Sequence, residues 1–182
     1  MRQHTFDGKL FPVSRSRDVV QGLQAYPSVE ACPERVDLAI LIVPANAIAD
    51  AMLSCGQSGV KAVLVLASGF AEEPGAAGDA MQAEMLDIAE TYGMLVLGPN
   101  AEGFSNMAAK LCATFSPTME LDDTPLVPDL QKGGHVAVVA QSGGVGYSFF
   151  DRGRPKELPF SYVVTTGNEA MVESLHVVDY LI

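Results

Sequence analysis

The sequence predicts an α/β protein built around a largely parallel sheet. Three times along the chain, an apolar run of strand length ends in a short turn that contains glycine. The three pairs of run and turn are Ala62–Leu66 with Ser68-Gly69-Phe70, Met94–Leu97 with Gly98-Pro99-Asn100, and His135–Ala140 with Gln141-Ser142-Gly143-Gly144. Stretches with helical spacing separate these runs, and an alternation of strands with helices is typical of parallel sheets.

The first half of the chain is expected to alternate strands and helices after a short opening strand at Lys9–Val13. Leu38–Val43 is uniformly apolar and rich in β-branched residues, which favours a strand buried on both faces. Asn46 stands where a helix N-cap is expected, and the helix that it begins should reach Gly56. The remaining elements expected here are strands at Lys61–Ala67 and Met94–Leu97 and an amphipathic helix at Gly78–Tyr92.

Residues Ser116–Gly134 interrupt this rhythm with prolines and acidic residues, so they are predicted to form a linker. A second α/β unit is expected after it. Its elements would be a strand at His135–Ala140, a helix at Gly143–Asp151, a strand at Phe160–Thr165, a turn at Gly167-Asn168-Glu169 and a helix from Val172 onward. We therefore expect one domain over residues 1–130 and the beginning of a second over residues 131–182.

The composition is that of an acidic, core-forming protein of 182 residues. A hydrophobic content of 48% with 18% charged residues excludes a disordered chain. The 11 Lys+Arg against 22 Asp+Glu give a net charge of −11, so nucleic acid is not an expected partner, because binding to a phosphate backbone needs a basic face. The three cysteines are widely spaced, which argues against a disulfide framework or a metal site and favours the cytoplasm. A membrane is not expected as a partner, because no apolar run approaches the roughly 20 residues that span a bilayer.

Both ends of the chain look unfinished for an α/β fold. A doubly wound domain normally opens with a strand and a glycine-rich loop, and no G-x-G-x-x-G occurs near the N-terminus. The last predicted helix runs to Ile182 without a cap. We therefore expect the first strand and its glycine-rich loop to be missing.

The glycine-containing turns are the candidate ligand sites. Turns that follow parallel strands meet at the carboxyl edge of the sheet, where α/β proteins bind ligands. Each turn is expected to offer unblocked backbone N–H groups to an anion. An ordinary turn without a ligand remains an alternative at each of them, and Ser142 could simply cap its own helix.

Five motifs occur in order along the chain: VDLAILIVPA, KAVLVLASGFAE, YGMLVLGPNAEGF, HVAVVAQSGGVGYSF and YVVTTGNEA. Together they resemble the nucleotide-diphosphate-forming acyl-CoA synthetases, the family of the succinyl-CoA synthetase alpha subunit and of the ADP-forming acetyl-CoA synthetases. The resemblance covers nearly the whole chain, and five ordered motifs are far more specific than any one of them. It implies a Rossmann-like CoA-binding domain followed by the start of a flavodoxin-like ligase domain.

The resemblance also implies roles for the turns. The residues that would line the CoA groove are Val43, Pro44, Ala45, Ser68, Gly69 and Phe70, with Pro99 and Asn100 near the pantetheine end. The residues that would cradle a phosphoryl group are Ser142, Gly143 and Gly144, with Asn168 and Glu169 close to the same centre.

By the same resemblance, the chain is part of an acid–thiol ligase that forms acyl-CoA from a small carboxylic acid, CoA and ATP or GTP. The acid would be activated as an acyl phosphate, and the phosphate would pass through a histidine. That histidine is expected downstream of Ile182, because none of the three histidines here matches its motif, so no catalytic residue is expected in this chain. ATP or GTP with Mg would bind to an ATP-grasp domain or a beta subunit, and the whole would be a cytoplasmic oligomer.

Two alternatives belong to other functional classes. One is a non-catalytic CoA-sensing region, as in protein acyltransferases that carry a synthetase-like part without the histidine. The other is a serine hydrolase, because Ala140–Gly144 resembles a loosened G-x-S-x-G elbow around Ser142, with Asp151 and His176 downstream. A dinucleotide-dependent dehydrogenase is disfavoured, since its glycine fingerprint is not seen.

Overall fold

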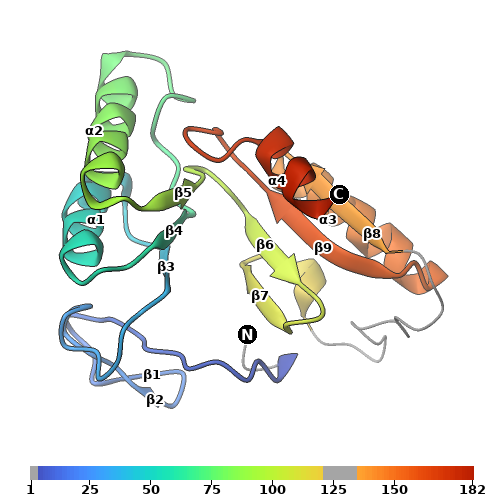
Figure 1. Ribbon diagram of the computed structural model, residues 1–182, viewed down its shortest axis with the longest axis horizontal. Helices are drawn as coiled ribbons and strands as arrows, with labels where there is room; N and C mark the ends of the chain where they lie inside the picture. Colours follow the sequence, from blue (N-terminus) through green and yellow to red (C-terminus); the bar gives the residue numbers. More distant parts are fainter. Residues whose placement is uncertain (1–3, 121–134) are drawn as a thin grey trace. The chain divides into compact units, whose positions relative to one another are not determined.

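The computed structural model describes residues 4–120 and 135–182, and its contacts divide the chain into two compact units (Figure 1). One unit comprises Gly8–Val96. The other comprises Leu97–Ile182 together with the described residues 4–7. The domain boundary expected at residue 130, and most of the predicted linker, lie outside the described residues.

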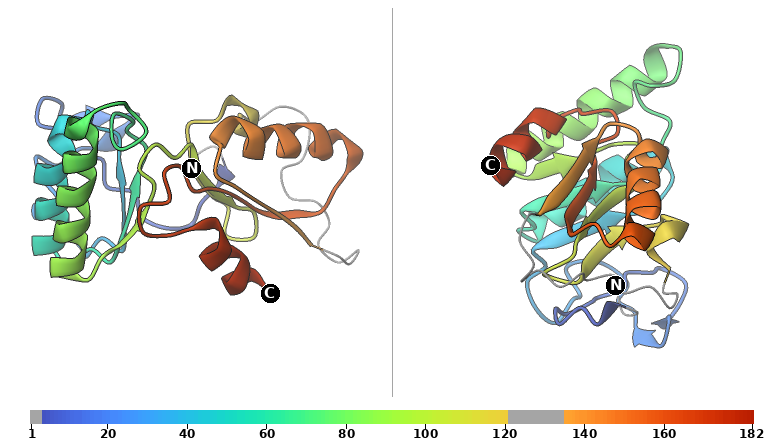
Figure 2. Two further views of the ribbon diagram at one scale, coloured as in Figure 1. Left: turned by 90° about the horizontal axis from the view of Figure 1, so that it is seen from above. Right: turned by 90° about the vertical axis from the view of Figure 1, so that its right-hand side faces the viewer.

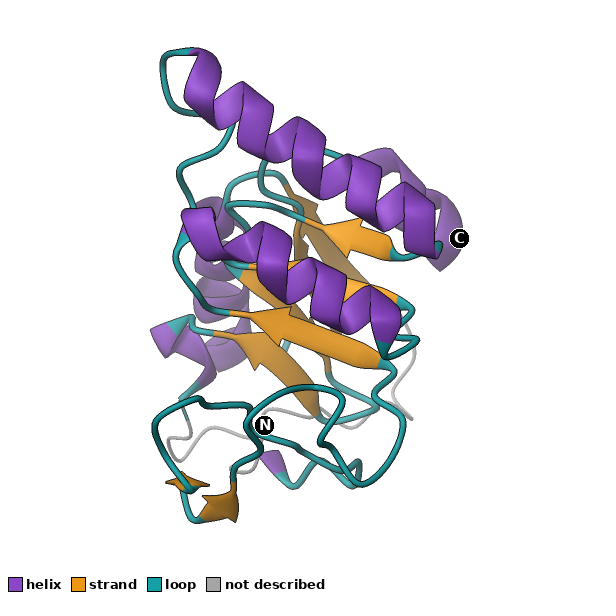
Figure 3. Cartoon of the chain, turned by 90° about the vertical axis from the view of Figure 1, so that its left-hand side faces the viewer, coloured by secondary structure: helices purple, strands orange, loops and turns teal. Residues whose placement is uncertain are grey.

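The Gly8–Val96 unit contains a three-stranded sheet in the order β3-β4-β5. Its elements are β1 (Val19–Val20), β2 (Leu23–Gln24), β3 (Leu38–Leu41), the 3-10 helix η2 (Ala45–Ala47), α1 (Ile48–Gln57), β4 (Ala62–Val65), α2 (Ala76–Tyr92) and β5 (Leu95–Leu97). Strands β3 and β4 are parallel, with Leu38 opposite Ala62, whereas β1 and β2 form a separate antiparallel pair. The predicted alternation of strands and helices is therefore confirmed here, and Figure 3 shows it by colour.

Two local predictions for this unit are wrong. Lys9–Val13 forms no strand; only Val13 makes an isolated bridge, to Tyr26. Pro12 has no N–H to donate, so this segment cannot continue a regular ladder. Asn46 is not the cap of α1, because it lies inside the 3-10 helix that precedes it.

Helices α1 and α2 lie side by side and share the core of this unit with β4 (Figure 1). Each supplies one buried face at helical spacing, which is the amphipathic pattern of a helix packed on a sheet. The buried residues are Ile48, Met52 and Cys55 of α1, Met85, Ile88 and Ala89 of α2, and Val63, Leu64 and Val65 of β4. Where the helices meet, Gly56 lies against the ring of Tyr92, and a side-chain carbon at position 56 would overlap that ring.

The Leu97–Ile182 unit contains a four-stranded sheet in the order β7-β6-β9-β8. Its elements are β6 (Gly103–Asn106), β7 (Leu111–Thr114), the 3-10 helix η3 (Pro117–Met119), β8 (Val136–Ala140), α3 (Gly143–Gly153), the 3-10 helix η5 (Arg154–Lys156), β9 (Phe160–Thr165) and α4 (Ser174–Leu181). Strands β8 and β9 are parallel, and β6 runs antiparallel to both β7 and β9. Helices α3 and α4 lie on opposite faces of the sheet (Figure 2).

The core of the second unit is aromatic. Tyr147 and Phe150 of α3 are buried against Phe160 and Val163 of β9. Burial raises the pKa of Tyr147 to about 12, and its hydroxyl lies 3.1 Å from the hydroxyl of Ser105. The buried hydroxyl groups of Tyr147 and Ser105 are therefore paired with each other inside the core, as burial requires.

Within residues 4–120 and 135–182, no helix has both the length and the apolar character that crossing a bilayer would require.

The contact between Gly56 and Tyr92 gives a test of the helix pair. Gly56→Ala is expected to lower the free energy of unfolding by about 1–3 kcal/mol, because the added methyl group would displace the ring or the helix. The higher helix propensity of alanine offsets part of this loss of stability. Urea denaturation would measure it. In a Tyr92→Ala background the same substitution should become neutral or stabilising; an unchanged loss there would show that the ring is not the cause.

Candidate functional site

Three turns of the Leu97–Ile182 unit are tied together by backbone hydrogen bonds. The amide of Asn168 donates to the carbonyl of Pro99 at 2.9 Å, and the amide of Ala170 donates to that of Gly98 at 3.2 Å. The amide of Gly167 donates to the carbonyl of Gln141 at 3.1 Å. The turn after β9 is thus bonded both to the turn after β5 and to the turn after β8. The structure therefore brings together residues that the sequence placed in two groups, the pantetheine end and the phosphoryl cradle.

Close approach and backbone conformation explain the residue types at this junction. Gly167 has a φ of +62°, and a Cβ atom there would overlap the carbonyl oxygen of Pro99 and lie 2.7 Å from the amide of Ala101. Asn100 has a φ of +57°, a conformation that asparagine tolerates better than most residues. Its side-chain amide donates to the Asn168 side-chain oxygen at 3.4 Å. Both asparagines of the predicted site thus face each other.

The turn after β8 opens helix α3, as predicted. The hydroxyl of Ser142 accepts from the amide of Val145 at 3.5 Å, so Ser142 is the N-cap. Gly144 has open space where a Cβ atom would lie. At Gly143, by contrast, a Cβ atom would overlap the side chain of Glu102, whose carboxylate lies beside the first turn of the helix.

Glu102 is a site residue that the sequence analysis missed. It follows Gly98-Pro99-Asn100-Ala101 directly, and this position next to a candidate turn was the available signal. Nothing in the apolar pattern indicates that its side chain covers the start of a helix about 40 residues later.

The carboxylate of Glu169 is engaged by its own loop. It accepts from the hydroxyl of Thr166 at 2.7 Å and from the amide of Ser174 at 3.0 Å. The hydrogen bond from Thr166 is the largest cause of a lowered Glu169 pKa, to which the Ser174 bonds add. Glu169 therefore closes the connection from β9 to α4 as an ionised group.

The structure gives no support to the hydrolase reading of Ser142. Asp151 lies eight residues beyond Gly143 on the same helix, a rise of about 12 Å from its start. The Nδ1 atom of His176 accepts from the amide of Glu173 at 3.1 Å as part of the capping box of α4. His176 is thus engaged in the cap of α4, and the hydroxyl of Ser142 caps its own helix.

The turns after β3 and β4 belong to the Gly8–Val96 unit. Because β3 and β4 are parallel neighbours, Val43-Pro44-Ala45 and Ser68-Gly69-Phe70 lie at the same edge of the sheet. A Cβ atom at Gly69, where φ is +104°, would lie 3.4 Å from the Cβ atom of Ala45. Phe70 is fully buried and anchors its turn. The structure thus brings these two predicted groups of residues together.

The amides of the Ser68–Phe70 turn are not open, contrary to expectation. The two carboxylate oxygens of Glu72 accept from the amide of Gly69 at 2.5 Å and from the amide of Phe70 at 3.2 Å. The sequence showed the turn and its glycine. It did not show that a side chain three residues later would supply the anion.

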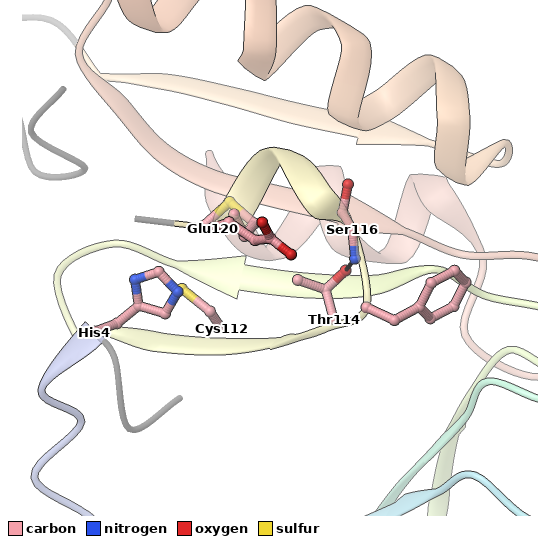
Figure 4. A pocket seen from close by; sticks show the side chains of 7 residues that line it. His4, Cys112, Thr114, Ser116 and Glu120 are labelled. Carbon is pink, nitrogen blue, oxygen red and sulfur yellow. Dashed lines mark hydrogen bonds between the residues drawn. The ribbon is translucent and has the colours of Figure 1, made fainter. Parts of the chain in front are cut away.

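A pocket of about 230 Å³ lies in the Leu97–Ile182 unit, and none of the predicted site residues lines it (Figure 4). His4, Cys112 and Glu120 are among its lining residues. The His4 side chain is buried, which lowers its pKa, and its Nδ1 atom has no hydrogen-bond partner. Within the described part of the chain, no cluster of three or more His, Cys, Asp or Glu side chains could hold a metal ion.

Comparison with known proteins identifies two family matches in succession. Residues 1–107 match the model of a CoA binding domain, and residues 133–182 match a succinyl-CoA ligase like flavodoxin domain. The fold class predicted from the sequence is therefore confirmed.

Curated relatives cover almost all of this chain. It is 35% identical over 174 residues to the acetate–CoA ligase (ADP-forming) II subunit alpha of Pyrococcus furiosus, covering 96% of this chain and 35% of that protein. It is 32% identical over 185 residues to the acetate–CoA ligase (ADP-forming) II of Archaeoglobus fulgidus, covering 100% of this chain and 26% of that protein. The chain thus spans between about a quarter and a third of the length of these relatives.

A solved structure has the same fold. The dinucleotide forming acetyl-coenzyme A synthetase 1 of Ca. Korarchaeum cryptofilum, in complex with phosphate and ADP, superposes with a TM-score of 0.85 at 31% identity. The match covers 98% of this chain and 36% of that structure. Since the first family model alone matches more than half of the residues, the chain belongs to the CoA binding domain family, with a succinyl-CoA ligase like flavodoxin part following it.

Proposed function

We propose that this chain is the CoA-binding part of an acid–thiol ligase that forms acyl-CoA from a carboxylic acid and CoA, using ATP or GTP. The observation that carries the proposal is the succession of the two family matches, in an order shared with relatives named ADP-forming acetate–CoA ligases. The non-catalytic CoA-sensing alternative has no specific observation in its favour.

CoA would bind along the carboxyl edge of the β3–β4 sheet. The groove residues in this unit are Val43, Pro44, Ala45, Ser68, Gly69 and Phe70. Support comes from the parallel pairing of the two strands and from the close approach of Gly69 to Ala45. Pro99 and Asn100 would contact the pantetheine end. They are proposed as the link to the chemistry because their turn is bonded to the loop of Asn168 and Glu169.

The phosphoryl group would be held at the start of α3 by Ser142, Gly143 and Gly144, with Asn168 and Glu169 beside it. The N–H groups of the two glycines that open the helix, together with the helix dipole, favour a dianion there. Gly144 supports this role, because the space beside it is open.

The proposed reaction has three bond exchanges. A histidine outside this chain takes the terminal phosphoryl group from the nucleotide, leaving the nucleoside diphosphate. The acid's carboxylate oxygen then accepts that phosphoryl group, which frees the histidine and forms the acyl phosphate. Finally the thiol sulfur of CoA bonds to the acyl carbon and phosphate leaves, with the thiol proton lost to solvent. Splitting the ligation in this way is covalent catalysis.

The remaining parts of the enzyme would be an ATP-grasp domain or beta subunit, which would bind the nucleotide and Mg, in an oligomeric cytoplasmic assembly. One relative carries the name subunit alpha, which supports a divided enzyme. The three free cysteines fit a reducing compartment.

The proposal is tested with the enzyme expressed together with any subunit that copurifies. Acetate, CoA and ATP or GTP should give acetyl-CoA with one nucleoside diphosphate and one phosphate released per turnover. CoA should also bind saturably in the absence of acid, whereas NAD should not bind. Saturable CoA binding without turnover for any carboxylic acid supplied would favour the CoA-sensing alternative instead.

Gly167→Ala should disrupt the junction of the three turns. A methyl group would overlap the Pro99 carbonyl, and the positive φ adds strain, so kcat/KM should fall roughly 10²-fold as the turns separate. Steady-state kinetics and thermal unfolding would be measured together. Gly75→Ala is the matched control, because Gly75 also has a positive φ but has open space around it. An equal loss of activity in the control would contradict a specific role for the junction.

Glu102→Gln should strengthen the binding of phosphate at the start of α3. Removal of a carboxylate beside Gly143 relieves like-charge repulsion, and the product-inhibition constant for inorganic phosphate should fall by about 2–5-fold. Asp151→Asn, which removes the same charge at the far end of this helix, serves as the control. Equal shifts in both variants would show that only net charge matters.

A further inference from the structure

We propose that Glu72 is a built-in anion that occupies the amides of the Ser68–Phe70 turn and excludes external anions from it. This inference rests on the CoA site proposed above and deepens it. It assigns to this turn the uncharged pantetheine arm of CoA, and it assigns the diphosphate and the 3′-phosphate to other parts of the enzyme.

The turn has the geometry of an anion-binding concavity. Two successive amides, those of Gly69 and Phe70, point at one carboxylate and use both of its oxygens. Successive N–H groups that converge in this way bind anions in many proteins, where the ligand is often a phosphate. Here the occupant is a side chain of the same loop.

The surrounding packing holds the amides in place independently of Glu72. Phe70 is fully buried, and a Cβ atom at Gly78 of α2 would overlap its carbonyl oxygen. On the other side, Gly69 lies against Ala45. With the backbone fixed on both sides, loss of the carboxylate would leave two oriented donors without their acceptor, and such donors require another partner.

Charge decides which ligand groups can approach. A phosphate that reached these amides would have to displace the Glu72 carboxylate or share their space with a like charge. Displacement within the same loop leaves the carboxylate nearby, so the repulsion persists. An amide or methylene of the pantetheine arm meets no such opposition. The wild-type turn is therefore expected to contact the neutral arm.

Glu73 provides a matched control. It neighbours Glu72 and is likewise exposed, and its own amide donates to the Phe70 carbonyl at 2.9 Å. The amides of Gly69 and Phe70, however, donate to Glu72. Glu73→Gln therefore changes the charge of the loop as Glu72→Gln does, while leaving the carboxylate that accepts from these two amides in place.

The test titrates inorganic pyrophosphate into the ¹⁵N-labelled full chain while the amide resonances of Gly69 and Phe70 are followed. Glu72→Ala and Glu72→Gln should bind pyrophosphate at these amides about tenfold more tightly than the wild type, and Glu73→Gln should match the wild type. Wild-type amides that saturate as readily as those of Glu72→Ala would overturn the proposal. The proposal would also be overturned if Glu72→Gln bound pyrophosphate no more tightly than the wild type does. This isosteric variant is the test to use if Glu72→Ala loses the native loop.

A second titration compares CoA with pantetheine on the wild type. Both should shift the Gly69 and Phe70 amides in the same direction. A shift with CoA that pantetheine does not reproduce would mean that phosphates reach the turn, and would refute the assignment of the neutral arm. A chain that binds CoA nowhere would refute the proposed function, while the pyrophosphate comparison would still decide the role of Glu72.

Discussion

The hydrogen bond from the Asn168 amide to the Pro99 carbonyl, at 2.9 Å, joins two of the turns that form the candidate site of the Leu97–Ile182 unit. It requires the two backbones to touch, and only glycine at position 167 permits that approach. Once this contact exists, the two asparagine side chains meet, and the turn after β8 is drawn in through Gln141. A candidate site made of three separate segments thus depends on glycine, which has no side chain, at position 167.

Elements that carry their own apolar signal could be predicted from the sequence. Phe160–Thr165 is a continuous run of strand formers, and it is a strand over those residues. The hairpin of β6 and β7 could not be predicted, because Gly103–Asn106 contains glycine and asparagine and gains its strand conformation from pairing with β9. Lys9–Val13 shows the converse, since an apolar pattern without a neighbouring strand made only one bridge.

The candidate site was predictable to the level of the backbone but not of the side chains that surround it. Glycines at the ends of apolar runs mark turns, because few other residues adopt their conformations, and Gly69 and Gly167 both have positive φ. Two acids, Glu72 beside Gly69 and Glu102 beside Gly143, belong to no periodic pattern in the sequence. Their roles depend on where a flexible side chain lies in three dimensions, which neither spacing nor composition encodes. Resemblance to a family shares this limit, since both acids stand inside the quoted motifs and the resemblance still assigned neither of them a role.

The antiparallel pairing of β6 with β9 has a consequence for how the protein is made. Phe104 lies opposite Val164, a separation of 60 residues in the sequence, whereas Leu38 in the other sheet pairs with Ala62 only 24 residues later. As the chain leaves the ribosome, the Gly8–Val96 unit can close its sheet while β9 is still unmade. Until β9 is made, the edge of β6 that will pair with it stays unpaired, and an unpaired strand edge can associate with other chains. The folding step with the longest sequence separation between paired strands therefore involves the same strand that leads out of the Gly98-Pro99-Asn100 turn.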